Sequence, residues 1–276
     1  MKSALAIHDL SCYSKSSLTV VLPILECAGV ECAVLPTAIL STQSDGFEDI
    51  FSQDCTNSCS TIIEKWKSLD FHFDAIYSGY LASSKQEELV LSSISAFKKK
   101  DTLVLVDPVL GDNMSLYQGF TDMHIKQMRS LIKKANIITP NWTEAQLLLN
   151  GKAVDESTTL SIASTKAKEL YKESGASVVI TSVPLSLGNL VNLAYDGSEV
   201  RCFSNDLLSP SLPGCGDMFA SLLLSLLLEN NSFFVSVRMA GEITTAALKE
   251  SLRCNREKRM GIMLKPALKL LSSYGL

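Results

Sequence analysis

The 276-residue sequence lacks the motifs of several common enzyme and binding classes. It has no Cys-x-x-Cys, and its three histidines are not paired at a metal-ligand spacing, so we expect no structural zinc site. It has no G-x-x-x-x-G-K-[ST], which excludes a P-loop. The dinucleotide fingerprint G-x-G-x-x-G also fails, because Phe219 stands where its third glycine belongs. No G-x-S-x-G occurs, so a serine-hydrolase elbow is excluded as well.

A strong charge of one sign is also missing. The 25 Lys and Arg residues against 29 Asp and Glu give a net charge of -4, which offers no electrostatic reason to expect nucleic acid or an anionic membrane as a partner. The longest apolar run, around 222–228, is far below the ~20 residues of a membrane span. The first residues carry one lysine and an apolar stretch too short for a signal peptide. We therefore expect a cytoplasmic protein with reduced cysteines.

Short β-type runs alternate with helical patterns along most of the chain, which is 46% hydrophobic and long enough for a single domain over 1–276. Strands are predicted at 4–8, 31–36, 73–81, 102–112, 136–140 and 176–182, with a hairpin over 189–204 around a type I′ turn at Asp196-Gly197. Helices are predicted at 17–29, 60–69, 85–100, 124–135, 142–151 and 157–175, and three more follow residue 211. This alternation predicts an α/β fold with a mostly parallel central sheet flanked by helices.

Polar residues punctuate the predicted strand ends. They are His8-Asp9, Gly79-Tyr80, Asp107-Pro108, Thr139-Pro140-Asn141 and Thr181-Ser182. Sheets of this kind bind ligands beyond the carboxyl ends of their strands, so the sequence predicts a binding site at that edge.

The stretch "VDPVLGD", residues 106–112, places Asp107 and Asp112 on either side of a Pro and Gly turn. Two carboxylates in this setting suit a hydrated divalent cation or phosphate-bound magnesium. A polar turn that ends a strand is the alternative interpretation, because Asp, Pro and Gly all favour turns.

The stretch "TPNWTEA", residues 139–145, predicts a helix N-terminus. Asn141 is a good N-cap and Glu144 lies three residues later, so a capping box accounts for both. The same helix start can face an anion or a metal-bound water, and the two interpretations are compatible.

The stretch "PGCGDMFAS", residues 213–221, precedes a strongly apolar helix. Gly214, Cys215 and Gly216 are placed to present backbone N–H groups that, with the helix dipole, favour developing negative charge. Asp217 is then placed to take a proton from an attacking hydroxyl. The alternative is that Asp217 is simply the helix N-cap.

Together these stretches resemble a known family. "DPVLGD", "TPNWTEA", "VVITS" and "PGCGDMFAS" occur in the order and spacing of the ribokinase-like superfamily. Within it, "IHDLSCYSKSSLTVVLPIL", "LPTAILSTQSDGF" and "DAIYSGYL" resemble segments of the vitamin B6 kinases, which act on pyridoxal, pyridoxine or pyridoxamine. The resemblance covers essentially the whole chain and implies a three-layer α/β/α ribokinase-like fold.

The resemblance also implies roles for individual residues. Asp217 matches the base that deprotonates the substrate's 5′-hydroxymethyl group, and Gly214, Cys215 and Gly216 match an anion hole. The residues matched to magnesium and the nucleotide phosphates are Asp107, Asp112, Thr139, Asn141, Glu144, Thr181 and Ser182, with Asp107 and Glu144 as the metal ligands. Those matched to the pyridine ring are Asp9, Ser44 and Tyr80. The family uses ATP with Mg²⁺, often with a monovalent cation such as K⁺, and is usually a homodimer.

The chain departs from the family pattern at three places. Cys215 stands where the family usually has threonine, and the N-terminal loop lacks the usual glycines near Cys12 and Ser14. Residues 41–46 read Ser-Thr-Gln-Ser-Asp-Gly instead of an Asn-His-Thr-Gly pattern. We expect these changes to affect substrate choice more than chemistry. Two alternatives to a B6 kinase therefore stay open: a hydroxymethylpyrimidine kinase of thiamine biosynthesis, and a non-catalytic ligand-binding protein on the same fold.

Overall fold

A nine-stranded sheet forms the centre of the computed structural model, which describes residues 1–154, 158–185, 190–205 and 211–274. The strand order is β11-β10-β9-β8-β5-β4-β1-β2-β3. The strands are β1 (Lys2–Ser11), β2 (Val30–Leu40), β3 (Ser52–Asp54), β4 (Ala75–Ser78), β5 (Leu103–Val106), β8 (Ile137–Ile138), β9 (Ser177–Pro184), β10 (Leu190–Tyr195) and β11 (Val200–Asn205). The six strands from β9 to β2 in this order pair in parallel, whereas β3, β10 and β11 pair antiparallel.

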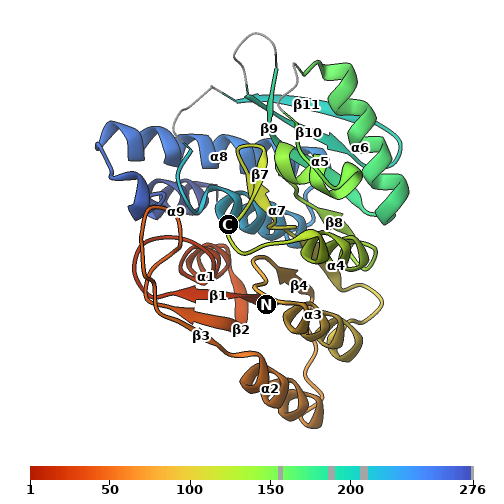
Figure 1. Cartoon of the computed structure of the whole chain (residues 1–276), viewed down its shortest axis with the longest axis vertical. Coiled ribbons are helices and arrows are strands. Elements are labelled where there is room, and N and C mark those ends of the chain that lie inside the picture. The colour runs from red at the N-terminus through yellow and green to blue at the C-terminus, as the bar shows by residue number, and fades with distance from the viewer. Residues whose placement is uncertain (155–157, 186–189, 206–210, 275–276) are drawn as a thin grey trace.

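Helices cover both faces of this sheet (Figure 1). One layer holds α1 (Leu18–Cys27), α7 (Cys215–Leu228), α8 (Phe233–Arg253) and α9 (Leu264–Ser273). The other holds α2 (Thr56–Ser68), α3 (Ser84–Phe97), α4 (Asp122–Ile132), α5 (Trp142–Asn150) and α6 (Leu160–Ser174). A short 3₁₀ helix, Lys258–Met260, precedes α9.

The side chains of β1 alternate between two separate cores. Leu5 and Ile7 pack with the α2–α6 layer, and Ala4 and Ala6 pack with α1 and α7. All four are fully buried, as expected of a parallel strand that is covered on both faces. The predicted α/β fold with three layers is therefore confirmed.

Several predicted boundaries were wrong. The strand predicted over 102–112 ends at Val106, and Gly111–Asp112 (β6) instead pairs with Ser115–Leu116 (β7) in a separate two-stranded sheet. The loop between β5 and β6 contains Pro108, which has no N–H to give to a strand ladder. The strand predicted over 31–36 runs on to Leu40, where the unpredicted β3 pairs with it.

The hairpin between β10 and β11 turns one residue later than predicted. The Asp196 amide donates to the Glu199 carbonyl at 3.4 Å, so Gly197 and Ser198 occupy the centre of the turn. Only Gly197 has a positive φ, whereas a type I′ turn needs two such residues. Residue 189 of the predicted hairpin and residue 157 of the predicted helix 157–175 lie outside the described residues.

Because β1, β4, β5 and β8 are neighbours in the sheet and parallel, their carboxyl ends lie side by side. The polar residues predicted at these strand ends are thus brought to one edge. No helix of the described part of the chain is long and apolar enough to cross a lipid bilayer. The single domain over 1–276 stays a prediction.

Three segments that are distant in sequence meet behind the start of α7. A Cβ added to Gly261 would lie 2.2 Å from the Lys15 carbonyl oxygen and 3.0 Å from that of Pro213. The Ile262 amide donates to the Pro213 carbonyl at 2.9 Å and fixes the same contact. The N-terminal loop and the approach to α9 therefore both support the turn before α7.

We expect Gly261→Ala to be much more destabilising than Gly175→Ala. Both glycines have positive φ, but Gly175, with φ 74° and ψ 4°, is in the left-handed region, which costs an alanine about 1 to 2 kcal/mol. Gly261, with φ 69° and ψ -178°, is in a region that is essentially restricted to glycine, which adds to the cost there. A Cβ at Gly175 meets nothing within 4 Å, whereas one at Gly261 meets two carbonyl groups. Urea unfolding should show an additional loss of about 2 kcal/mol for Gly261→Ala. Equal losses in the two variants would contradict this packing.

Candidate active site

Asp217 lies in the first turn of α7 but does not cap the helix. The N-cap is Gly214, with φ 85°, and no side chain caps the helix start. The Asp217 carboxylate instead accepts a hydrogen bond from the Ser17 amide at 2.9 Å, across 200 positions of the chain. The alternative interpretation of Asp217 as a helix cap is therefore wrong.

The charge of Asp217 has no cationic partner within the described ranges. Burial, together with the nearby charge of Asp9, raises the pKa of Asp217 to about 6, although the Ser17 amide opposes the shift. His8 Nδ1 is 3.9 Å from Asp217 Oδ1, but burial lowers the pKa of His8 to about 3, so the ring is neutral. Both ring nitrogens of His8 are buried and have no hydrogen-bond partner in the described residues.

Asp9 is linked to Asp217 through Ser17. Asp9 is 3% exposed, and its carboxylate accepts hydrogen bonds from the hydroxyls of Ser17 and, at 3.0 Å, Ser11. Ser17 therefore donates its hydroxyl to one carboxylate and its amide to the other. Sequence reasoning missed Ser17.

The family's N-terminal loop usually contains glycines that this chain lacks, and two serines adopt glycine-like backbone conformations in this loop. Ser17 has φ 48° and ψ -131°, and Ser14 has φ 73°, both in a region that glycine enters much more readily. The loop thus keeps glycine-like backbone geometry with serines in place. The departure from the family pattern near Ser14 was the signal that could have drawn attention to Ser17.

The turn before α7 presents free amides. In the described chain, the amides of Gly214 and Gly216 donate to no protein acceptor, whereas the Cys215 amide donates to the Leu212 carbonyl at 3.3 Å. Unpaired amides at a helix N-terminus form a ready site for an anion. Burial raises the pKa of the Cys215 thiol to about 11, which keeps it neutral near pH 7.

Asp107 follows β5 and lies close to this turn. It is 7% exposed, and its Oδ1 accepts the Thr139 hydroxyl at 3.1 Å. A Cβ built on Gly216 would lie 3.8 Å from Asp107 Oδ2. Burial, and then the charge of Asp217, raise the pKa of Asp107.

Asn141 and Glu144 form the predicted capping box at the start of α5. The Asn141 amide donates to Glu144 Oε2 at 2.8 Å, and the Glu144 amide donates to Asn141 Oδ1 at 2.9 Å. Glu144 Oε1 also accepts the Leu110 amide at 3.1 Å, and Asn141 Nδ2 donates to the Gly111 carbonyl. Burial, and then the charge of Asp107, raise the pKa of Glu144. Through these hydrogen bonds, the Glu144 carboxylate links the start of α5 to the segment that follows Asp107.

The other residues predicted to bind the nucleotide lie farther out. Asp112 is exposed in β6, and its carboxylate accepts the Asn113 amide at 2.8 Å. Thr181 is half-buried and bridges to Asn141, which brings it to the same edge of the sheet. Ser182 is exposed with φ 54°, and its amide donates to Asn192 Oδ1 at 3.2 Å.

Of the two other residues predicted to contact the pyridine ring, Tyr80 lies near Asp9, whereas no contact within the described ranges joins Ser44 to either. Burial, and then the charge of Asp9, raise the pKa of Tyr80. Its ring stacks on Phe120 with centroids 5.6 Å apart. Ser44 is exposed in a loop, and no hydrogen bond in the described chain joins it to Asp9, Asp217 or Tyr80. Its role stays a prediction.

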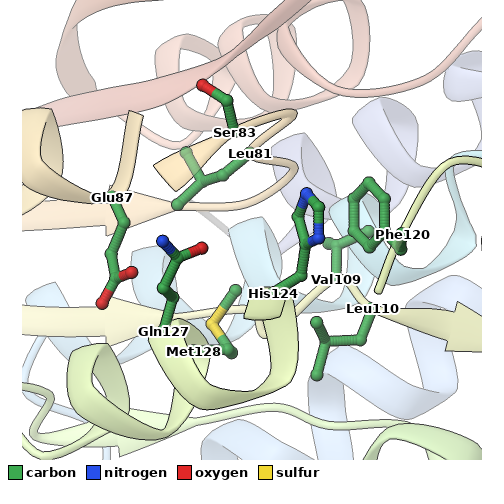
Figure 2. Close-up of a pocket in the computed structure, with 9 residues that line it drawn as sticks. All are labelled: Leu81, Ser83, Glu87, Val109, Leu110, Phe120, His124, Gln127 and Met128. Carbon is green, nitrogen blue, oxygen red and sulfur yellow. The ribbon is translucent and has the colours of Figure 1, made fainter. Parts of the chain in front are cut away.

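A small pocket lies beside this centre, between α3 and α4 (Figure 2). Its lining includes Phe120, which also stacks on Tyr80, together with Glu87 and His124. None of the predicted site residues lines it. Burial, with the nearby Glu88, raises the pKa of Glu87 to about 7. The pocket is therefore separate from the carboxylates at the sheet edge.

The predicted metal ligands do not form a complete metal cage. No group of three or more His, Cys, Asp or Glu in the described residues is arranged to hold an ion. Asp107 nevertheless lies near the free amides, and its Oδ2 accepts no hydrogen bond from the residues that the structure describes. Magnesium is commonly held by one or two carboxylates together with substrate phosphates, so this donor set fits Mg²⁺ that arrives with a nucleotide.

We expect Asp217→Asn to stabilise the protein at pH 7.5 in magnesium-free buffer. A carboxylate whose pKa is raised on folding destabilises the folded state at pH values above that pKa, and the penalty disappears below the ordinary pKa of 3.8. A rise to about 6 corresponds to a gain of at most ~3 kcal/mol for the neutral amide at pH 7.5. Most of this gain should be lost at pH 4.5. Urea unfolding at both pH values measures it, with the exposed Asp101→Asn as the control. A gain that did not depend on pH would contradict this explanation.

The fold and the edge site together define a ribokinase-like kinase, with a mostly parallel three-layer sheet and a carboxylate beside a glycine turn at the strand ends. The chain belongs to the phosphomethylpyrimidine kinase family, whose sequence profile matches residues 22–261. The resemblance to the ribokinase-like superfamily and its vitamin B6 kinases is thus confirmed.

Known relatives include both B6 kinases and thiamine-biosynthesis enzymes. The chain is 29% identical to the pyridoxine kinase of Bacillus subtilis over 66% of each chain. It is 28% identical to the bifunctional thiamine-biosynthetic enzyme TH1 of Arabidopsis thaliana over 81% of this chain, but it spans only 42% of that enzyme's length.

Solved structures resemble the whole chain more closely. A Bacteroides thetaiotaomicron protein assigned to the phosphomethylpyrimidine kinases and solved with pyridoxal is 34% identical, with a TM-score of 0.90 over 98% of this chain and 96% of that one. The pyridoxal kinase of Lactobacillus plantarum is 28% identical, with a TM-score of 0.91 over 100% of this chain and 98% of that one.

Proposed function

We propose that this protein is an ATP-dependent kinase that phosphorylates the 5′-hydroxymethyl group of a vitamin B6 vitamer. The observation that carries the proposal is Asp217, a carboxylate aligned by the Ser17 amide beside a turn with free amides. Ligand binding alone does not need such a carboxylate, and its uncompensated charge costs stability. The pyridoxal bound by the 34% identical Bacteroides protein supports a B6 vitamer as the substrate.

Each site residue has a separate proposed role in phosphoryl transfer. Asp217, with a pKa of about 6, is ionised near pH 7 and takes the proton from the hydroxymethyl group as that oxygen attacks the terminal phosphoryl of ATP. The bond from this phosphorus to the bridging oxygen breaks, and ADP leaves with the electron pair. The free amides of Gly214 and Gly216 stabilise the negative charge on the phosphoryl oxygens. Phosphoryl transfer depends mainly on positioning and on electrostatic stabilisation, which these residues provide.

Asp107 and Glu144 are the residues proposed to hold Mg²⁺. The ion, when bound with the nucleotide, neutralises phosphate charge. Asp107 Oδ2 lies near Gly216, in the turn that presents the free amides. Glu144 accepts hydrogen bonds from the amides of Leu110 and Asn141, and these bonds hold the segment that follows Asp107. The nucleotide is proposed to be bordered by Asp112, Thr139, Asn141, Thr181 and Ser182. K⁺ binding, a homodimer and a cytoplasmic location remain further proposals.

A hydroxymethylpyrimidine kinase is the second candidate. The family to which the chain belongs and the thiamine-biosynthetic relative from Arabidopsis favour it. The same base and anion hole would serve both substrates, because both present a hydroxymethyl group on a planar heteroaromatic ring. The two functions therefore differ in how the ring is recognised.

A substrate panel tests the choice between the two candidates. With Mg²⁺ and ATP, we expect turnover of at least one of pyridoxal, pyridoxine and pyridoxamine with a higher kcat/KM than hydroxymethylpyrimidine. Coupled detection of ADP, with the phosphorylated product identified by mass spectrometry, measures it. Turnover of the pyrimidine alone would replace the B6 proposal with the second candidate.

The variant Asp217→Asn tests whether Asp217 acts as the general base of the proposed reaction. Loss of a general base lowers kcat by about a hundredfold or more, whereas binding of the vitamer is retained because the amide keeps the shape of the side chain. Single-turnover kinetics and calorimetric binding separate the two effects. Asp101→Asn is the exposed control and should keep full activity. Undiminished kcat in Asp217→Asn would remove this residue from the mechanism.

A further inference from the structure

The two carboxylate oxygens of Asp217 have different surroundings. The Ser17 amide donates to Oδ2 at 2.9 Å. No hydrogen bond in the described part of the chain reaches Oδ1, and His8 Nδ1 lies 3.9 Å from it. A single hydrogen bond fixes one oxygen but leaves the plane of the carboxylate free to turn about it. The orientation of Oδ1, the oxygen left to take a proton, therefore depends on its other neighbours.

Close packing holds the His8 ring in place. The ring is fully buried, and its centroid lies 4.4 Å from that of Tyr77 in an edge-to-face contact. The backbone of Gly79 closes on the same ring, since a Cβ added there would clash with its Cε1 and Nδ1 atoms. The ring has little room to turn, so the direction in which Nδ1 points is fixed before any ligand binds.

The position of the proton on the His8 ring follows from the nearby charge of Asp217. Burial lowers the pKa of His8 to about 3, so near pH 7 one ring nitrogen carries a proton and the other a lone pair. Neither nitrogen has a hydrogen-bond partner among the described residues. A lone pair on Nδ1 would be repelled by the Asp217 carboxylate, whereas an N–H there is attracted to it. The charge of Asp217 therefore favours the tautomer with the proton on Nδ1.

Resting on the proposed function, we propose that His8 is a positioning residue whose Nδ1–H binds Asp217 Oδ1 in the substrate complex and orients the base toward the attacking hydroxyl. Hydrogen bonds between catalytic groups are often long in a free enzyme and shorten when substrate binds, which accommodates the separation of 3.9 Å. With Ser17 on one oxygen and His8 on the other, the plane of the carboxylate is fixed. Oδ1 keeps a second lone pair for the proton of the substrate, and His8 itself gains none.

Two variants of matched shape, His8→Asn and His8→Leu, test this role. Their side chains branch alike, but an Asn amide N–H can take the place of Nδ1–H, whereas Leu has no donor. With pyridoxine, or with hydroxymethylpyrimidine if only that is turned over, His8→Leu should lower the single-turnover rate at least tenfold and change KM less than threefold. His8→Asn should stay within threefold of the wild-type rate. Equal rates in the two variants would overturn the role of His8, because a merely structural residue affects both alike.

Nitrogen-15 NMR of the histidine-labelled wild-type protein gives a second reading that needs neither activity nor a folded His8 variant. The chemical shifts of the ring nitrogens distinguish the two tautomers, and the signals of His72 and His124 are identified in His72→Gln and His124→Gln. We expect the proton of His8 on Nδ1 at pH 7.5, and a proton on Nε2 would overturn its role even in an active kinase. If neither class of substrate is phosphorylated, the proposed function fails, but a proton on Nδ1 still supports the interaction of His8 with Asp217.

Discussion

The site depends on one constraint: carboxyl groups gather at one edge of the sheet, and no cationic side chain in the described part of the chain balances them. Burial raises the pKa of each of the four carboxylates there, which are Asp9, Asp107, Glu144 and Asp217. Hydroxyls and backbone amides hold them, and these donors orient a carboxylate without neutralising it. The described residues therefore leave the charge of these carboxylates unbalanced, and a bound ligand that carries positive charge would balance it. Such a site lowers the stability of the fold in exchange for function.

The position of this charge is set by parts of the chain that are far apart in sequence. The loop after β1 supplies the Ser17 amide, the approach to α9 supplies Gly261, and both pack against the turn that begins α7. The start of α5 adds a second attachment, because Glu144 accepts amides from its own helix cap and from Leu110. The carboxylates at this edge are held by hydrogen bonds from backbone amides. Backbone amides move less than the ends of long, flexible side chains do.

Much of this arrangement could be predicted from the sequence, because it follows from local patterns. Apolar strands alternating with helices indicated the layers, and the Asn141–Glu144 spacing indicated the capping box that the structure contains. The antiparallel strand β3 could not be predicted, because its three residues are exposed and its existence depends on pairing with β2. Ser17 was missed for a similar reason: its partners lie 8 and 200 positions away, and nothing in its own neighbourhood requires them. Long-range hydrogen bonds of this kind leave no periodic signal.

Small side chains on the central strands carry a further consequence. Ala4, Ala6 and Ala75 face the layer of α1 and α7 and are fully buried there. Small side chains here let the layer of α1 and α7 pack closely on the central strands, and α7 carries Asp217 in its first turn. A bulkier residue would lift the helix, and a shift of about 1 Å at reacting groups can cost roughly a hundredfold in rate. Three methyl groups without chemistry of their own thus limit how closely this helix layer approaches the strands, and the position of the proposed base depends on that layer.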